Sequence, residues 1–123
     1  MFNFLKSSSG PRVERISPSD AVARAQKGEL VVIDVRDINE LRASGKAKGA
    51  LHIPLMLLRT KVDPKSDELA KGLSVDTPVA LYCASGARSQ AAGKMMLDLG
   101  YTQVYNIGGL GDWRAGGGLV NPA

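Results

Sequence analysis

The sequence predicts an α/β domain built on a mainly parallel sheet with helices on both faces. Patterns typical of strands alternate with patterns typical of helices, an order that produces right-handed crossovers between parallel strands. The apolar, β-branched run at residues 30–33 is continuous, as in strands buried on both faces of a parallel sheet. The chain has 123 residues, 44% hydrophobic and 23% charged, which fits one globular domain and excludes disordered and low-complexity classes.

The first helix is predicted to begin after Ser17, which can cap it, with Pro18 at its first position and an end at Gly28. The buried strand at residues 30–33 follows and ends at Asp34. This order of helix and strand is the first half of an α/β unit.

A second, shorter helix is predicted where Asp37 and Glu40 have the spacing of a capping box. A short strand is expected next, at residues 50–53. Two helical pieces are then expected, at residues 55–59 and 66–71.

The clearest pattern is a strand at residues 79–82, a glycine-containing loop and a helix at residues 89–99. Within that helix, Gly93 is expected to allow close approach to the sheet. A last strand is predicted at residues 103–107, followed by a helical turn in which Trp113 anchors the core.

The chain is expected to form a flexible N-terminal leader at residues 1–10, a single domain at 11–116 and a C-terminal tail at 117–123. No apolar stretch approaches the roughly 18 residues that span a bilayer, and the start of the chain lacks the basic region of a signal peptide. We therefore expect a cytoplasmic protein with no membrane partner.

Charge and cysteine content exclude several kinds of partner. The net charge of +4 favours small anions, but the basic residues are scattered singly with few aromatics to stack on bases, so no nucleic-acid partner is expected. Cys83 is the only cysteine, which excludes an intramolecular disulfide and a cysteine-based zinc cluster. We expect no metal.

Cys83 is placed at the end of a predicted strand, and Arg88 lies at the mouth of the helix that follows. The residues between them are small: Ala84, Ser85, Gly86 and Ala87. Such a loop lets backbone N–H groups curl around the sulfur, while the helix N-terminus and the arginine add positive charge. These effects favour the thiolate, which is the nucleophilic form of cysteine. The alternative is an inert buried cysteine.

Asp34 and Arg36 lie at the end of another predicted strand, so they should be at the same carboxyl edge of the sheet as Cys83. Asp34 could be a general acid, but a bracing ion pair with Arg36 is the favoured interpretation. His52, the only histidine, is expected to have a structural or surface role, because it lies in a predicted strand between Leu51 and Ile53.

The chain resembles the rhodanese homology domain from about residue 16 to residue 116. Each motif is weak alone, but their order and their places at the ends of elements make the set specific. The motifs are residues 32–36 with Glu40, Gly49 and Ala50 leading to Ile53 and Pro54, the loop from Cys83 to Arg88 followed by Ser89, and Gly108 and Gly109 with Trp113.

The resemblance implies a rhodanese-like fold with a five-stranded, mainly parallel sheet and a sulfurtransferase that needs no cofactor. Cys83 would carry a sulfane sulfur as a persulfide, taken from a thiosulfate-like or persulfide donor and given to cyanide, a thiol or a sulfur-relay protein. The residues implied to bind the donor or form the loop are Ala84, Ser85, Gly86, Ala87, Arg88 and Ser89, with Asp34, Arg36 and Glu40 in support.

The chain departs from the family where a Gly-His-Ile sequence is common. It has Gly45, Lys46, Ala47 and Lys48 there. The two lysines could attract anions or could be solvated surface charges.

Two other functions stay open. Tyrosine and dual-specificity phosphatases place five residues between cysteine and arginine, whereas four residues separate Cys83 from Arg88. No Asp-bearing general-acid loop is recognisable either. Phosphatase or arsenate reductase activity is therefore a minor alternative. The second alternative function is that of a sulfur-relay or protein-interaction module. Catalysis is favoured because Cys83 and Arg88 are both present, although a relay would keep them as well.

Overall fold

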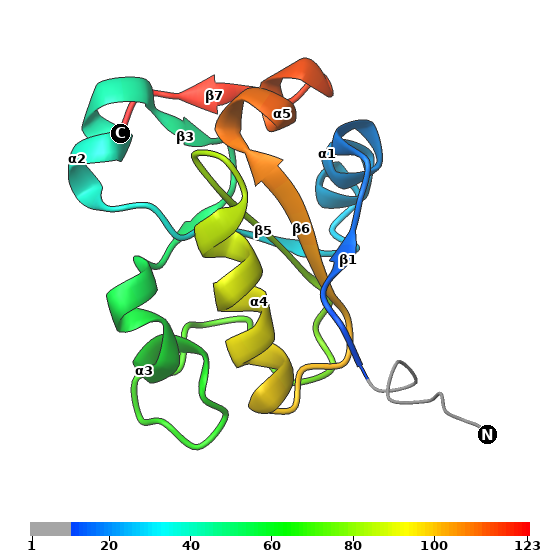
Figure 1. The fold of residues 1–123 in the computed structure, drawn as a ribbon, viewed down its shortest axis with the longest axis vertical. Helices are drawn as coiled ribbons and strands as arrows, with labels where there is room; N and C mark the ends of the chain where they lie inside the picture. Colours follow the sequence, from blue (N-terminus) through cyan, green and yellow to red (C-terminus); the bar gives the residue numbers. More distant parts are fainter. Residues whose placement is uncertain (1–10) are drawn as a thin grey trace.

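The computed structural model describes residues 11–123, so the leader expected at residues 1–10 lies outside the described residues. A five-stranded sheet with the order β1-β6-β5-β2-β4 forms the centre of the fold, and every neighbouring pair in it is parallel (Figure 1). The predicted α/β class is confirmed. The strands of this sheet are β1 Glu14–Arg15, β2 Val31–Asp34, β4 Leu51–His52, β5 Val79–Cys83 and β6 Val104–Gly109.

Helices cover both faces of the sheet, as the sequence predicts. The helices α3 and α4 pack on one face, and α1 and α5 pack on the other. Each face of the sheet has its own hydrophobic core, and side chains of β2 point alternately into one and the other. Ile33 lies in the core under α3 and α4, and Val32 lies in the core under α1 and α5, which accounts for the continuous apolar run of this strand. The helices are α1 Pro18–Gln26, α2 Ile38–Ser44, α3 Leu58–Val62 (preceded by the 3₁₀ turn η2 Leu55–Leu57), α4 Ala87–Asp98 and α5 Leu110–Ala115.

Local sequence signals set several of these boundaries. The Ser17 hydroxyl accepts a hydrogen bond from the Asp20 amide at 3.2 Å, and Asp37 and Glu40 form the predicted capping box. Gly93 lies close to neighbouring segments, since a Cβ there would be 2.7 Å from the Val13 side chain. The predicted close approach of this helix is therefore confirmed.

The helix predicted at residues 66–71 is wrong, because this segment consists of turns. The Ser66 hydroxyl accepts a hydrogen bond from the Glu68 amide at 3.0 Å, a local bond that competes with helix formation. The Ala70 amide donates instead to the carbonyl of Lys61 at 2.7 Å, which ties the segment to α3.

A second, two-stranded sheet pairs β3 Lys46–Ala47 with β7 Val120–Asn121 in antiparallel register. Neither segment shows a strand pattern in the sequence, which predicts a tail at residues 117–123. The tail also packs on Trp113, whose indole N–H donates to the Leu119 carbonyl at 2.8 Å. The ordered chain thus continues beyond residue 116.

A buried polar cluster joins these sheets to α2. Arg36 is 3% exposed and forms an ion pair at 2.8 Å with Asp34, which is fully buried. The Tyr82 hydroxyl donates to the same carboxylate and accepts from the Ala47 amide at 2.9 Å. Arg36 also donates to the hydroxyl of Ser44, at the end of α2, at 2.8 Å. One carboxylate therefore links β2, β5, β3 and α2.

We expect Asp34→Ala to lower the free energy of unfolding by about 3–5 kcal/mol, because it leaves the buried Arg36 charge uncompensated. Urea unfolding followed by circular dichroism measures this. The exposed Asp76 supplies the matched control, and Asp76→Ala should change stability by less than about 0.5 kcal/mol. A loss below about 1 kcal/mol in Asp34→Ala would contradict the central role of this cluster.

Candidate active site

Cys83 ends β5 at the carboxyl edge of the sheet, with its side chain almost fully buried at 1% exposure. Its Sγ accepts a hydrogen bond from the Gly86 amide at 3.0 Å and lies 3.5 Å from the Ser89 hydroxyl. Ala84, Ser85 and Ala87 are exposed and form the outer side of the loop. The loop therefore wraps the sulfur as the sequence predicts.

The pKa of the Cys83 thiol results from two opposing effects. Burial alone raises it, because a charged sulfur loses its hydration. The Ser89 hydroxyl beside the sulfur, together with hydrogen bonds from the amides of Ser89, Gly86 and Ser85, outweighs burial and lowers the pKa to about 7. The sequence predicts a shift caused by the loop amides, the helix end and Arg88, and it does not reveal the part played by the Ser89 hydroxyl.

Two glycines allow the chain to close around Cys83. Gly86 has a φ of +107°, a left-handed conformation that strains any residue with a Cβ. Gly109 on β6 lies against the loop, and a Cβ there would be 2.2 Å from the Ala84 carbonyl oxygen. The double glycine of the sequence motif is thus required where β6 passes the loop.

Asn106, which sequence reasoning read only as part of a strand, holds the loop from β6. Its Oδ1 accepts from the Ser89 hydroxyl at 2.7 Å and from the Gly108 amide at 3.0 Å. Its Nδ2 donates to the Gly86 carbonyl at 3.0 Å. A polar amide near the carboxyl end of an otherwise apolar strand was the available signal.

Arg88 is engaged by Glu40 of α2. Its two terminal nitrogens donate to the two carboxylate oxygens at 2.5 and 2.8 Å, and these hydrogen bonds lower the pKa of Glu40 to about 2. The ion pair joins the first turn of α4 to α2. The sequence analysis expects the positive charge of Arg88 to bind the anionic donor. In the structure this charge is paired with the Glu40 carboxylate.

The other candidate residues lie behind or beside the loop. Asp34 and Arg36 bond to each other and to α2 rather than to the loop, as described above. The His52 Nε2 lies 2.7 Å from the Arg36 carbonyl oxygen. Lys46 donates to the Ala50 carbonyl at 2.5 Å, and Lys48 is exposed.

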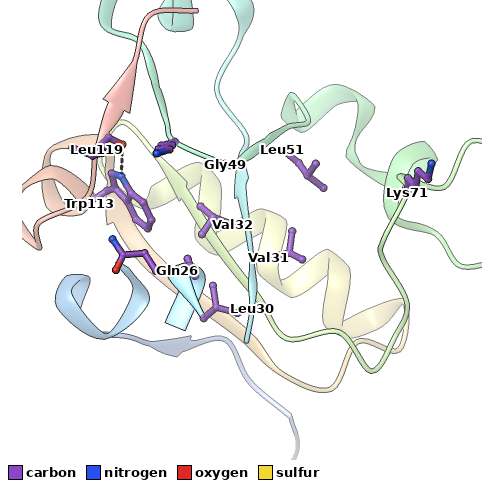
Figure 2. A pocket seen from close by; sticks show the side chains of 11 residues that line it. Gln26, Leu30, Val31, Val32, Gly49, Leu51, Lys71, Trp113 and Leu119 are labelled. Carbon is purple, nitrogen blue, oxygen red and sulfur yellow. Dashed lines mark hydrogen bonds between the residues drawn. The ribbon is translucent and has the colours of Figure 1, made fainter. Parts of the chain in front are cut away.

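A groove borders the loop and is lined by residues of α2 and α5. It is lined by Ala84 of the loop, Leu110, Gly111 and Arg114 of α5, and Arg36, Glu40, Ala43 and Ser44. A larger apolar pocket lies at the beginning of β2, around Val31, Leu51, Trp113 and Leu119, and no residue of the loop lines it (Figure 2). The groove therefore adjoins the loop at Ala84, the residue that follows Cys83.

The family model of the rhodanese-like domain matches residues 17–116. The chain belongs to this family. Thiosulfate sulfurtransferase GlpE of Pseudomonas entomophila is 31% identical over 103 residues, which are 83% of this rhodanese-like chain and 85% of that enzyme. The resemblance identified from sequence is confirmed.

Two solved structures extend the comparison. A Rhodopseudomonas palustris protein of unknown function, described as a possible tyrosine phosphatase, matches with a TM-score of 0.78 and 33% identity over 89% of this chain and 85% of its own. The polysulfide-sulfur transferase homodimer of Wolinella succinogenes matches with a TM-score of 0.65 and 36% identity over 87% and 78%. The relatives named as transferases support a sulfurtransferase.

Neither a metal centre nor a membrane span is found in the part of the chain that the structure describes. Among residues 11–123, no group of three or more histidine, cysteine, aspartate or glutamate side chains is arranged to hold a metal ion. Within the same residues, no helix has the length and apolar character needed to cross a bilayer.

We expect the Cys83 thiolate to form with a midpoint near pH 7, measured by the ultraviolet absorbance of the thiolate. Cys83→Ser supplies the blank, since the chain has no other cysteine. Ser89→Ala should move the midpoint to higher pH, because the sulfur loses the hydroxyl 3.5 Å away that lowers its pKa. Ser85→Ala is the matched control, because Ser85 contributes through its backbone amide. A wild-type midpoint near the ordinary thiol value of about 8.5 would contradict the argument.

Proposed function

We propose that this rhodanese-like domain is a sulfurtransferase that carries a sulfane sulfur on Cys83, from a thiosulfate-like or persulfide donor to cyanide or a thiol. The observation that carries the proposal is the Cys83 sulfur, held by the Gly86 amide at 3.0 Å and stabilised as a thiolate near pH 7. A thiolate at neutral pH is the nucleophile that attack on sulfane sulfur requires.

In the first step the Cys83 thiolate attacks the outer sulfur of thiosulfate. A bond forms between Sγ and that sulfur, the donor's S–S bond breaks, and sulfite leaves with the electron pair. The enzyme then holds a persulfide anion on Cys83, and the charges balance. The negative charge is then on the outer sulfur, one bond from Sγ, so the amides of Ser85, Gly86 and Ser89 that favour the thiolate remain close to it.

In the second step cyanide or a thiolate attacks the outer sulfur of the persulfide. The Sγ–S bond breaks, the Cys83 thiolate is restored as the leaving group, and thiocyanate or an acceptor persulfide departs. The low pKa of Cys83 serves this step as well, because a stable thiolate leaves readily. The first product leaves before the acceptor binds, so ping-pong kinetics follow.

The description of one structural neighbour as a possible tyrosine phosphatase keeps phosphoryl transfer as the second candidate. The four residues between Cys83 and Arg88 favour the transfer of a single sulfur atom, because they form a ring one residue shorter than a phosphatase loop. Within residues 11–123, the groove beside the loop is lined by one carboxylate, Glu40, and this one is bound to Arg88. A carboxylate so bound is unsuited to act as a general acid.

Incubation with thiosulfate should add one sulfur atom to the Cys83 peptide, detected by mass spectrometry. Cyanide should remove that atom with release of thiocyanate, and Cys83→Ser should take up none. Absence of an adduct together with hydrolysis of an aryl phosphate would overturn the proposal in favour of a phosphatase. Inertness toward both substrates would favour an interaction module.

Glu40→Gln and Arg88→Ala separate two roles of Arg88. If Arg88 attracts the anionic donor, Arg88→Ala should lower kcat/KM for thiosulfate by about tenfold, the effect of one charge-assisted hydrogen bond. Glu40→Gln should then lower the KM, because it frees the guanidinium. Equal losses in both variants would instead show that Arg88 acts only by holding the loop against α2.

A further inference from the structure

The groove beside the Cys83 loop is larger than a small inorganic donor needs. Its volume of about 370 Å³ lies within the range of roughly 300–1,000 Å³ in which proteins bind organic molecules. One end of the groove is at the loop, because Ala84 is among its lining residues. Gly109, the residue before α5, lies against Ala84, so the groove passes from the loop to α5. A molecule in the groove would therefore lie against the loop beside Cys83 with one end and extend along α5.

The groove contains one cation that is not committed to another group. Arg36 is paired with Asp34, and Glu40 is paired with Arg88. Arg114, on the exposed side of α5, makes no side-chain hydrogen bond or ion pair within residues 11–123. Its guanidinium is thus available to an anionic group of a ligand.

The other residues that line the groove can contact the apolar part of an organic molecule. Leu110, Ala43 and Ala84 contribute apolar surface, and a Cβ added at Gly111 would meet nothing within 4 Å. Gly111 thus leaves room between the loop and Arg114. Apolar surface with one convergent charged group is the usual composition of a small-molecule site.

We propose that this groove binds the organic part of a carboxylate-bearing persulfide, with Arg114 pairing with the carboxylate and fixing specificity for such donors over thiosulfate. The inference rests on the proposed function of Cys83. In the reaction, Sγ bonds to the outer sulfur of R–S–SH, the donor's S–S bond breaks, and R–S⁻ leaves with the electron pair. The transferred sulfur stays on Cys83 as S–SH.

Kinetics with two donors test the proposal. Arg114→Ala should lower kcat/KM for glutathione persulfide about five- to tenfold, mainly through KM, because a partly exposed ion pair is lost. With thiosulfate the change should stay below about twofold, because this donor has no organic part to reach α5. Arg59→Ala, which removes an exposed arginine of α3 outside the groove, is the matched control and should change neither value.

A second variant tests the volume without changing charge. Gly111→Leu should fill the open space, so it should impair glutathione persulfide and spare thiosulfate, with an unchanged melting temperature. Equal losses with both donors, or no loss with either in both variants, would overturn the proposal.

Binding without sulfur transfer separates this inference from the proposed function. Calorimetry with Cys83→Ser and S-methylglutathione, which has no sulfane sulfur, should detect binding that Arg114→Ala weakens about five- to tenfold. Lack of binding to Cys83→Ser would overturn the groove proposal even if wild-type protein forms a persulfide. Binding without any persulfide on the wild-type protein would instead overturn the proposed function and leave the groove supported.

Discussion

The buried ion pair between Asp34 and Arg36 is the constraint on which the site depends. Both side chains are removed from water, so their charges are stable only because each finds its partners inside the protein. Arg36 uses its remaining donors on Ser44 and Gly45 at the end of α2, which fixes that helix against the sheet. The position of α2 in turn decides where Glu40 lies. Because Glu40 holds Arg88, the ion pair in the sheet determines how the first turn of α4, and with it the Cys83 loop, is presented.

The sulfur is buried and yet ionisable because its hydrogen bonds come from groups that are already in place. A thiol buried among apolar groups has a raised pKa, and the core around Cys83 is apolar on the side of α4. The amides of the loop and the Ser89 hydroxyl offset this burial. Asn106 of β6 accepts a hydrogen bond from the Ser89 hydroxyl and donates one to the Gly86 carbonyl, so β6 holds the loop in place. Such donors need no reorganisation when charge develops on the sulfur.

The sequence predicted the features that depend on neighbouring residues. The caps at Ser17 and Asp37, the buried strand β2 and the strand, loop and helix around Cys83 each follow from local spacing. The features it missed depend on contacts between distant residues. Pairing of β3 with β7 joins segments more than 70 residues apart with no apolar alternation. The bond from Asn106 to Ser89 and the pair of Glu40 with Arg88 likewise form only when separate elements meet.

The pairing of Arg88 with Glu40 suits a site that must release anions as well as bind them. In the proposed reaction sulfite and thiolates are the leaving groups, so an unpaired arginine over the sulfur would hold product and donor equally well and would add nothing to the chemical step. With that charge balanced by Glu40, the negative charge on the Cys83 sulfur is stabilised by directional hydrogen bonds from the loop, such as the one from the Gly86 amide at 3.0 Å. Stabilisation is therefore concentrated on sulfur held at Cys83, and anions that are not bonded to the cysteine can leave.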